Sequence, residues 1–173
     1  MSVKQLIHQN THNKKLARNI RILCDDIRTP ENLGMIFRVA EAFGVELIYL
    51  TSNCPDSSNI KVRKTSRSTI DRIKSIVIDD KSELLTDLKD KDYRLIGVEI
   101  TNTSKRIQEL DLKPESKIIL VIGSERNGIT KEVLSNLDEC YHIEMFGENS
   151  SMNVVNALSI SLYEIQRANS GNL

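Results

Sequence analysis

The chain has 173 residues, of which 39% are hydrophobic and 28% charged, a composition that excludes intrinsic disorder and suits one domain with a single sizeable core. No apolar run approaches the roughly 20 residues that a membrane-spanning helix needs, so we expect no membrane span. The 24 basic and 24 acidic residues give a net charge of zero, which argues against a strong nonspecific polyanion binder.

The polar N-terminal segment, residues 1–17, lacks the apolar stretch of a secretory signal, and we expect it to be an extension of a single domain spanning residues 1–173. The cysteines Cys24, Cys54 and Cys140 are odd in number and widely spaced, without a CxxC pair. This spacing favours reduced thiols in a cytoplasmic protein over a disulfide framework or a zinc site. The three histidines are also scattered, so we expect no metal centre.

The first predicted strand covers residues 20–24, a helix follows over 30–43, and a second strand covers 45–50. Thr29 can cap this helix and Pro30 suits its first turn.

Apolar residues of this helix share one face. Arg38 lies on the far side of the helical wheel, near Gly34 and Glu41. The Arg38 side chain therefore faces either water or a ligand bound over the edge of the sheet.

Charged residues are segregated along the chain although the net charge is zero. A basic stretch with one acid, Asp71, follows the second strand and contains Lys61, Arg63, Lys64, Arg67, Arg72 and Lys74. A second basic group around the start of the first strand contains Lys14, Lys15, Arg18 and Arg21. Acids gather afterwards at Asp79, Asp80, Glu83, Asp87, Asp90 and Asp92. This segregation is typical of a phosphate-facing patch, and a solvated charged surface explains it equally well.

Four further strand-like runs cover residues 75–78, 93–98, 117–122 and 140–143, and a last helix begins near Ser151. Near-continuous apolar runs that alternate with helices predict a parallel sheet covered on both faces. The pattern alone predicts an unknotted, doubly wound α/β sheet, because true knots are essentially absent from ordinary folds.

Two segments after late strands, residues 118–130 and 143–156, place glycine and small polar residues just before a helix. Open α/β sheets bind ligands at such strand ends. Gly123-x4-Gly128 resembles half of a P-loop, but Ile129 stands where a P-loop has its lysine, which disfavours a nucleoside triphosphatase. No G-x-G-x-x-G follows the first strand, which disfavours a dinucleotide site and the usual Gly-rich methyltransferase site.

Three segments together resemble the SpoU (TrmH) family of RNA ribose 2′-O-methyltransferases, within the SPOUT superfamily. The first is NLGMIFRVA at residues 32–40, which matches the family pattern N-x-G-x-I-x-R-x-A. The second is VIGSERNGI at 121–129, and the third is IEMFGENSSMNV at 143–154. The chain departs from the family at Glu144, where members usually carry proline.

The resemblance implies an α/β fold with a C-terminal deep trefoil knot, the SPOUT or α/β-knot fold, in a homodimer with its sites at the interface. It implies S-adenosylmethionine as methyl donor and structured RNA, tRNA first and rRNA second, as substrate. The residues that would hold the cofactor by family position are Val98, Glu99, Gly123, Ile143, Met145, Ser151 and Met152.

The resemblance also gives Arg38 the central catalytic role, with Asn32, Glu125 and Asn153 positioning it and the ribose phosphate. A free guanidinium is essentially never deprotonated in proteins, so we expect Arg38 to clamp a phosphate and stabilise developing alkoxide charge rather than to act as a base. From the basic stretch, the residues expected to contact the RNA backbone are Lys61, Arg63, Lys64 and Arg67.

Two other functions stay open on the same fold. One is a catalytically silent RNA-binding or ribosome-assembly module, and the other is a SPOUT enzyme that methylates a base nitrogen. The presence of Asn32, Arg38, Glu125 and Asn153 weighs against the silent module, and the spacing of the first-motif arginine favours ribose chemistry over base chemistry.

Overall fold

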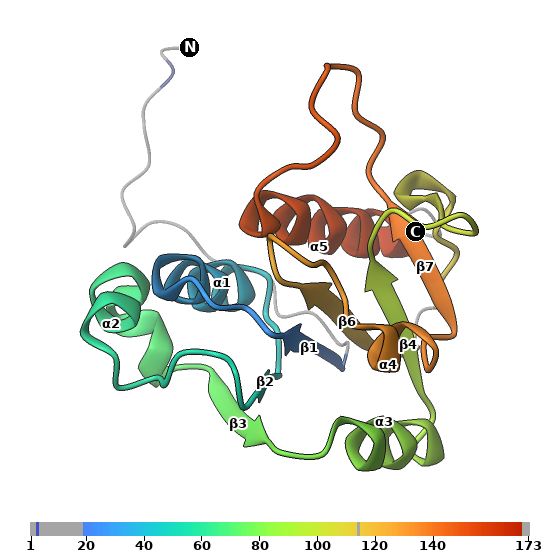
Figure 1. Ribbon diagram of the computed structural model, residues 1–173. Helices are drawn as coiled ribbons and strands as arrows, with labels where there is room; N and C mark the ends of the chain where they lie inside the picture. Colours follow the sequence, from blue (N-terminus) through green and yellow to red (C-terminus); the bar gives the residue numbers. More distant parts are fainter. Residues whose placement is uncertain (1–2, 4–18, 114, 171–173) are drawn as a thin grey trace.

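The computed structural model describes residues 3, 19–113 and 115–170. Within these residues, one sheet has the strand order β3-β2-β1-β6-β4-β7-β5, and every paired neighbour runs parallel (Figure 1). The strands are β1 (Ile20–Asp25), β2 (Leu47–Thr51), β3 (Lys74–Ile78), β4 (Tyr93–Val98), β5 (Lys105–Arg106), β6 (Lys117–Gly123) and β7 (Glu139–His142). The predicted parallel α/β sheet is thereby confirmed.

Helices cover both faces of the sheet. They are α1 (Pro30–Ala42), α2 (Ile60–Ser66), α3 (Lys81–Asp90), α4 (Lys131–Leu134) and α5 (Val154–Ser170), with short 3-10 helices η2 (Arg67–Asp71) and η3 (Ile107–Glu109). Side chains of α1, α5 and η3 share one hydrophobic cluster with the sheet, whereas α3 and α4 pack into a second cluster on the other face. Among the described residues, no helix is both long and apolar enough to cross a bilayer.

The predicted strands all form, with ends that differ by no more than two residues. The helix predicted over 30–43 also forms, and Gly44 follows its end with a φ of +67°, which glycine adopts without strain. The capping role predicted for Thr29 is wrong in one respect, because its side chain makes no capping hydrogen bond.

The last helix starts later than predicted, at Val154 instead of near Ser151. The Val155 N–H donates to Asn153 Oδ1 at 2.9 Å, so Asn153 caps the helix and the residues before it stay in the preceding loop. The extension predicted over residues 1–17, with the basic residues Lys14 and Lys15, lies outside the described residues, as does Arg18.

Strand register brings three loops to one place. Asp25 at the end of β1 pairs with Gly123 at the end of β6, and Val98 at the end of β4 pairs with Ile122. Because these strands are parallel, the segments that follow them leave the sheet at the same edge. The long segment between β7 and α5 rises from this part of the molecule (Figure 1).

Candidate active site

A cavity of about 670 Å³ opens at the carboxyl ends of β4, β6 and β7. Most of its walls come from segments 98–101, 122–129 and 142–154. The structure brings together all the residues predicted to hold a cofactor, since the lining includes Val98, Glu99, Gly123, Ile143, Met145, Ser151 and Met152. The volume falls within the roughly 300–1,000 Å³ that small-molecule sites occupy, and the mixture of apolar and polar walls is typical of them.

The segment after β6 forms a tight loop that closes on itself. The Ser124 N–H donates to the Gly128 carbonyl at 3.2 Å, and the Gly128 N–H donates to the Ser124 carbonyl at 2.8 Å. A Cβ at Gly123 would lie 2.1 Å from the Gly128 carbonyl carbon and 2.2 Å from the Ile129 nitrogen. Only glycine fits at position 123, because the neighbouring atoms are backbone and cannot rotate away.

Two carboxylates from the strands beside β6 anchor the end of this loop. The Ile129 N–H donates to Glu99 Oε2 at 3.0 Å, and the next amide, that of Thr130, donates to Asp25 Oδ2 at 2.7 Å. The second oxygen of Glu99 accepts from the Ile100 N–H at 3.0 Å. The Ile129 and Thr130 amides are thus bound internally and not presented to a phosphate, which argues against the P-loop alternative.

Three of the four predicted catalytic residues form one hydrogen-bonded network. Asn32 Nδ2 donates to Glu125 Oε1, and Asn153 Nδ2 donates to Asn32 Oδ1 at 3.2 Å. Asn32 belongs to the first turn of α1, Glu125 to the loop after β6, and Asn153 to the cap of α5. The network therefore joins all three sequence motifs at the rim of the cavity, to which Glu125 contributes directly.

Arg38 lies apart from this network. It follows Asn32 by six residues of α1, which places it about 9 Å further along the helix and about 240° around it. Its Nη1 lies 3.9 Å from Met35 Sδ, and within the part of the chain that the structure describes it forms no ion pair and no hydrogen bond to the network. The guanidinium is half-buried and free to bind an anion.

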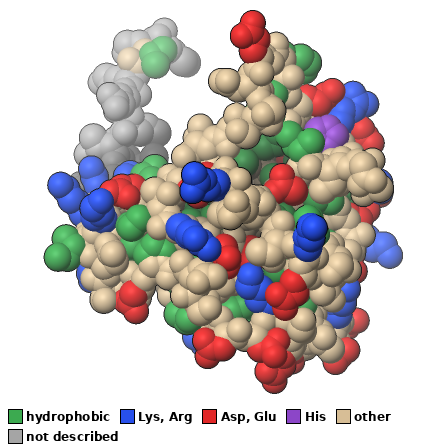
Figure 2. Space-filling model, viewed as in Figure 1, with side chains coloured by type: hydrophobic (Ala, Val, Ile, Leu, Met, Phe, Trp, Pro, Cys, Tyr) green, Lys and Arg blue, Asp and Glu red, His purple; other side chains and the backbone are tan. Residues whose placement is uncertain are grey.

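The predicted RNA-contacting residues divide into two kinds. Lys61 and Arg63 form ion pairs with acidic neighbours at 3.2 and 3.4 Å. Lys64 and Arg67 are exposed, and neither forms an ion pair with any described residue. Figure 2 shows Lys and Arg side chains gathered over α2, while Asp and Glu side chains gather at the end of the molecule that carries α3.

Sequence reasoning missed other residues that line the cavity, among them Thr101, Arg126 and His142. Each lies within or beside a segment that the motifs had marked, so proximity in sequence was the available signal. His142 Nδ1 lies 3.0 Å from Ser104 Oγ. Beside the cavity, the Cys140 thiol donates to the Glu99 carbonyl at 3.5 Å, and burial raises the pKa of this thiol, so it stays neutral at pH 7.

Known proteins share both the sequence pattern and the fold. The 23S rRNA (guanosine-2'-O-)-methyltransferase RlmB of Xylella fastidiosa is 31% identical over 146 residues, which cover 84% of this chain and 57% of that protein. The SpoU methyltransferase AviRb from Streptomyces viridochromogenes, solved in complex with AdoMet, superposes with a TM-score of 0.80 at 22% identity, covering 88% of this chain and 58% of that chain. A structure described as giving insights into the 2-OH methylation of C/U34 on tRNA superposes with a TM-score of 0.77 at 21% identity, covering 88% of this chain and 97% of that chain.

The two structural likenesses show that the sheet and its helices have the same fold as these two solved structures. The chain spans little more than half the length of the Xylella relative. The model of the SpoU rRNA Methylase family matches residues 19–163, which is most of the chain. The chain therefore belongs to the SpoU rRNA methylase family.

Proposed function

We propose that this protein transfers a methyl group from S-adenosylmethionine to a ribose 2′-hydroxyl of structured RNA, with tRNA as the first substrate to test and rRNA as the second. The observation that carries the proposal is the position of the Asn32–Glu125–Asn153 network at the rim of a cavity lined by every residue expected to hold the cofactor. The RlmB relative and the structure concerned with tRNA 2-OH methylation support ribose chemistry.

The cavity fits S-adenosylmethionine in size and in chemistry. Val98, Ile143 and Met152 offer apolar surface for an adenine ring, while Ser151 and the backbone of the loops offer polar groups for the ribose and amino acid parts. When bound, the cofactor would supply an electrophilic methyl group to the 2′-oxygen, with S-adenosylhomocysteine as the leaving group and solvent water as the acceptor of the hydroxyl proton. The AdoMet-bound AviRb structure, with the same fold, supports this assignment.

The chain's own residues bind and orient the RNA. Arg38 has a guanidinium without an acidic partner among the described residues, so it can clamp a phosphate beside the target ribose and stabilise negative charge developing on the 2′-oxygen. The network of Asn32, Glu125 and Asn153 fixes the rim where that ribose must sit.

Incubation of the purified protein with S-adenosylmethionine and unmodified tRNA or rRNA transcripts tests the proposal. Digestion to nucleosides and mass spectrometry should reveal a 2′-O-methyl nucleoside. A methyl group found only on bases would instead support a base-nitrogen enzyme, and RNA binding without methylation would support a silent binding module.

Lys64 and Arg67 are proposed to contact RNA phosphates, because they are the two of the four predicted contacts that form no ion pair with a described residue, and both are exposed. The double variant Lys64→Ala/Arg67→Ala should weaken RNA binding, and the slope of log affinity against log salt should become shallower by about 1.4 to 1.8. Filter binding at several salt concentrations measures both. Lys91→Ala, which removes an exposed lysine from the acidic end of the molecule, serves as the control and should leave the slope unchanged. An unaltered slope in the double variant would exclude these residues from the RNA surface.

We infer that two copies of the chain associate through α5. Ile160 and Tyr163 lie one turn apart on this helix with 38% and 60% of their surface exposed, an apolar stripe that a monomer would leave in water. Tyr163→Asp combined with Ile160→Asp should yield monomers in sedimentation velocity runs. Val77→Asp, which places the same charge at a comparably exposed apolar position on β3, should leave dimers intact. A double variant that sediments as the wild type does would contradict this interface.

We also infer that the segment after β7 is threaded into the trefoil knot that the sequence resemblance implies. α5 packs against β4, β6 and η3, and η3 belongs to the connection between β4 and β6. The chain thus returns from β7, near one edge of the sheet, to lie against a connection formed earlier in the sequence. This return supports the inference that the segment after β7 passes through the connection between β4 and β6.

A further inference from the structure

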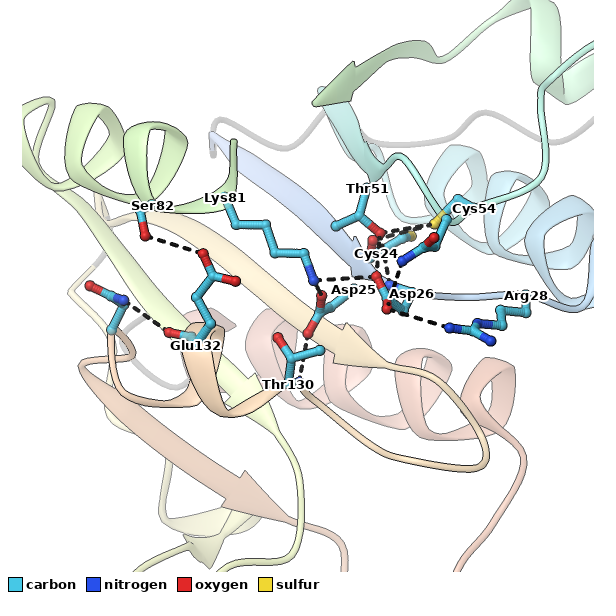
Figure 3. Close-up of polar contacts among 12 residues, drawn as sticks. Cys24, Asp25, Asp26, Arg28, Thr51, Cys54, Lys81, Ser82, Thr130 and Glu132 are labelled. Atoms are coloured by element: carbon cyan, nitrogen blue, oxygen red, sulfur yellow. Dashed lines mark hydrogen bonds and ion pairs between the residues drawn. The ribbon is translucent and has the colours of Figure 1, made fainter. Parts of the chain in front are cut away.

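A buried carboxylate at the end of β1 joins three elements of the fold. Asp25 has none of its side chain exposed, and its Oδ1 lies 2.6 Å from Lys81 Nζ at the start of α3 (Figure 3). Its second oxygen accepts the Thr130 N–H at 2.7 Å, at the end of the loop after β6. Each carboxylate oxygen of Asp25 therefore has a partner. Oδ1 pairs with the Lys81 ammonium, and Oδ2 accepts a hydrogen bond from a backbone amide of the candidate site.

Lys81 is itself held by a second acid. Its Nζ lies 3.2 Å from Asp26 Oδ1, and Asp26 is fixed by hydrogen bonds from Thr51 Oγ1 at 2.9 Å and Asn53 Nδ2 at 3.1 Å. Burial lowers the pKa of Lys81, but hydrogen bonds and Coulombic attraction to Asp25 and Asp26 outweigh it and raise that pKa. Lys81 thus stays charged at neutral pH, and its ammonium is paired with the buried carboxylate of Asp25.

The Asp25 carboxylate of this ion pair also anchors the end of the loop between β6 and α4. Two successive backbone amides of the loop donate hydrogen bonds to carboxylates. The Ile129 N–H donates to Glu99, which follows β4, and the Thr130 N–H donates to Asp25 at the end of β1. Ile129 lines the cavity, and the same loop carries Glu125 of the polar network. Loss of one anchor would free the loop to shift relative to both the cavity and the network, and shifts of about 1 Å can cost about 100-fold in rate.

We propose that Asp25 and Lys81 are positioning residues that hold the Gly123–Thr130 loop in its cofactor-binding geometry, although neither touches the cavity. This inference rests on the proposed function only in naming the cofactor. The Thr130–Asp25 hydrogen bond and the Asp25–Lys81 ion pair do not depend on which ligand the cavity binds.

Lys81→Met tests the inference with two independent measurements. Hydrogen exchange of the Ile129 and Thr130 amides in the cofactor-free protein should accelerate at least about tenfold, while amides of β2 and the rest of the sheet change little. The KM for S-adenosylmethionine should rise about tenfold or more, with a smaller change in the KM for RNA. Lys81→Arg, which restores the cation, should recover most of both losses.

Lys91→Met is the matched control, because it breaks an exposed pair between Asp87 of the same helix and the residue that follows the helix end, at 2.7 Å. The control should match the wild type in both measurements. Asp25→Asn/Lys81→Met removes both charges together and provides a folded alternative if the single variant is unstable; it should show the same loop-specific exchange. Wild-type exchange at Ile129 and Thr130 in these variants, or equal acceleration throughout the sheet, would overturn the inference. A wild-type protein that takes up no S-adenosylmethionine would defeat the proposed function, whereas the exchange data would still decide the positioning claim.

Discussion

Gly123→Ala is expected to destroy the cofactor site and to destabilise the fold. The added Cβ would lie 2.1, 2.2 and 2.4 Å from three backbone atoms of Gly128 and Ile129, distances that real Cβ atoms do not reach. The loop therefore has to move away from β6, breaking the paired hydrogen bonds between Ser124 and Gly128. Overpacking of this kind costs about 3 kcal/mol of unfolding free energy, and displacement of the cavity wall should reduce S-adenosylmethionine affinity by at least about tenfold.

Gly147→Ala is the matched control for this prediction. Gly147 lies in the other loop of the site, with nothing within 4 Å of an added Cβ, and its φ is not positive. Chemical denaturation and calorimetry of the control should therefore resemble the wild type. Wild-type stability and cofactor affinity in Gly123→Ala would show that the tight contact between Gly123 and the Gly128 backbone does not shape the site.

Arg38→Ala is expected to lower the methylation rate by about 10²–10³ with little change in S-adenosylmethionine affinity. Arg38 is not among the residues that line the cavity, and its Nη1 lies 3.9 Å from Met35 Sδ of the same helix, so its removal leaves the cofactor walls intact. What is lost is the cation that binds the substrate phosphate and stabilises charge on the 2′-oxygen. Single-turnover kinetics with saturating RNA and cofactor isolate this effect from binding.

Arg38→Lys and Arg106→Ala give this experiment its controls. Lysine keeps the charge but cannot bind a phosphate through two parallel hydrogen bonds, so an intermediate rate is expected. Arg106 is an exposed arginine on β5 paired with Glu109 at 2.7 Å, and its removal should leave the rate unchanged. A wild-type rate in Arg38→Ala would remove this residue from the mechanism.

Strand positions were predictable because buried parallel strands need continuous apolar runs. Residues 93–98 and 117–122 illustrate this, and β4 forms over the first of these ranges without any shift in its ends. Strand β5 escaped prediction because two exposed residues, Lys105 and Arg106, carry no apolar pattern. The order of strands depends on tertiary pairing, such as Asp25 with Gly123, which no local pattern encodes.

The sequence predicted which residues form the candidate site better than it predicted the hydrogen bonds that hold them. The expected cofactor residues do line one cavity, because parallel strands deliver their following loops to the same edge. The hydrogen bonds of Glu99 to backbone amides were not foreseen, nor was the burial of Asp25, because an acid in a sequence looks the same whether it is solvated or anchors a loop. The separation of Arg38 from Asn32 follows from helix geometry, but what bridges them depends on the bound substrate.

Isothermal titration of the folded protein with S-adenosylmethionine, alone and with candidate tRNA or rRNA transcripts, tests the central claim most directly. Saturable uptake at one site per chain, absent in Gly123→Ala and retained in Gly147→Ala, is the predicted result. Absence of uptake by folded wild-type protein, with every transcript tried, would contradict it.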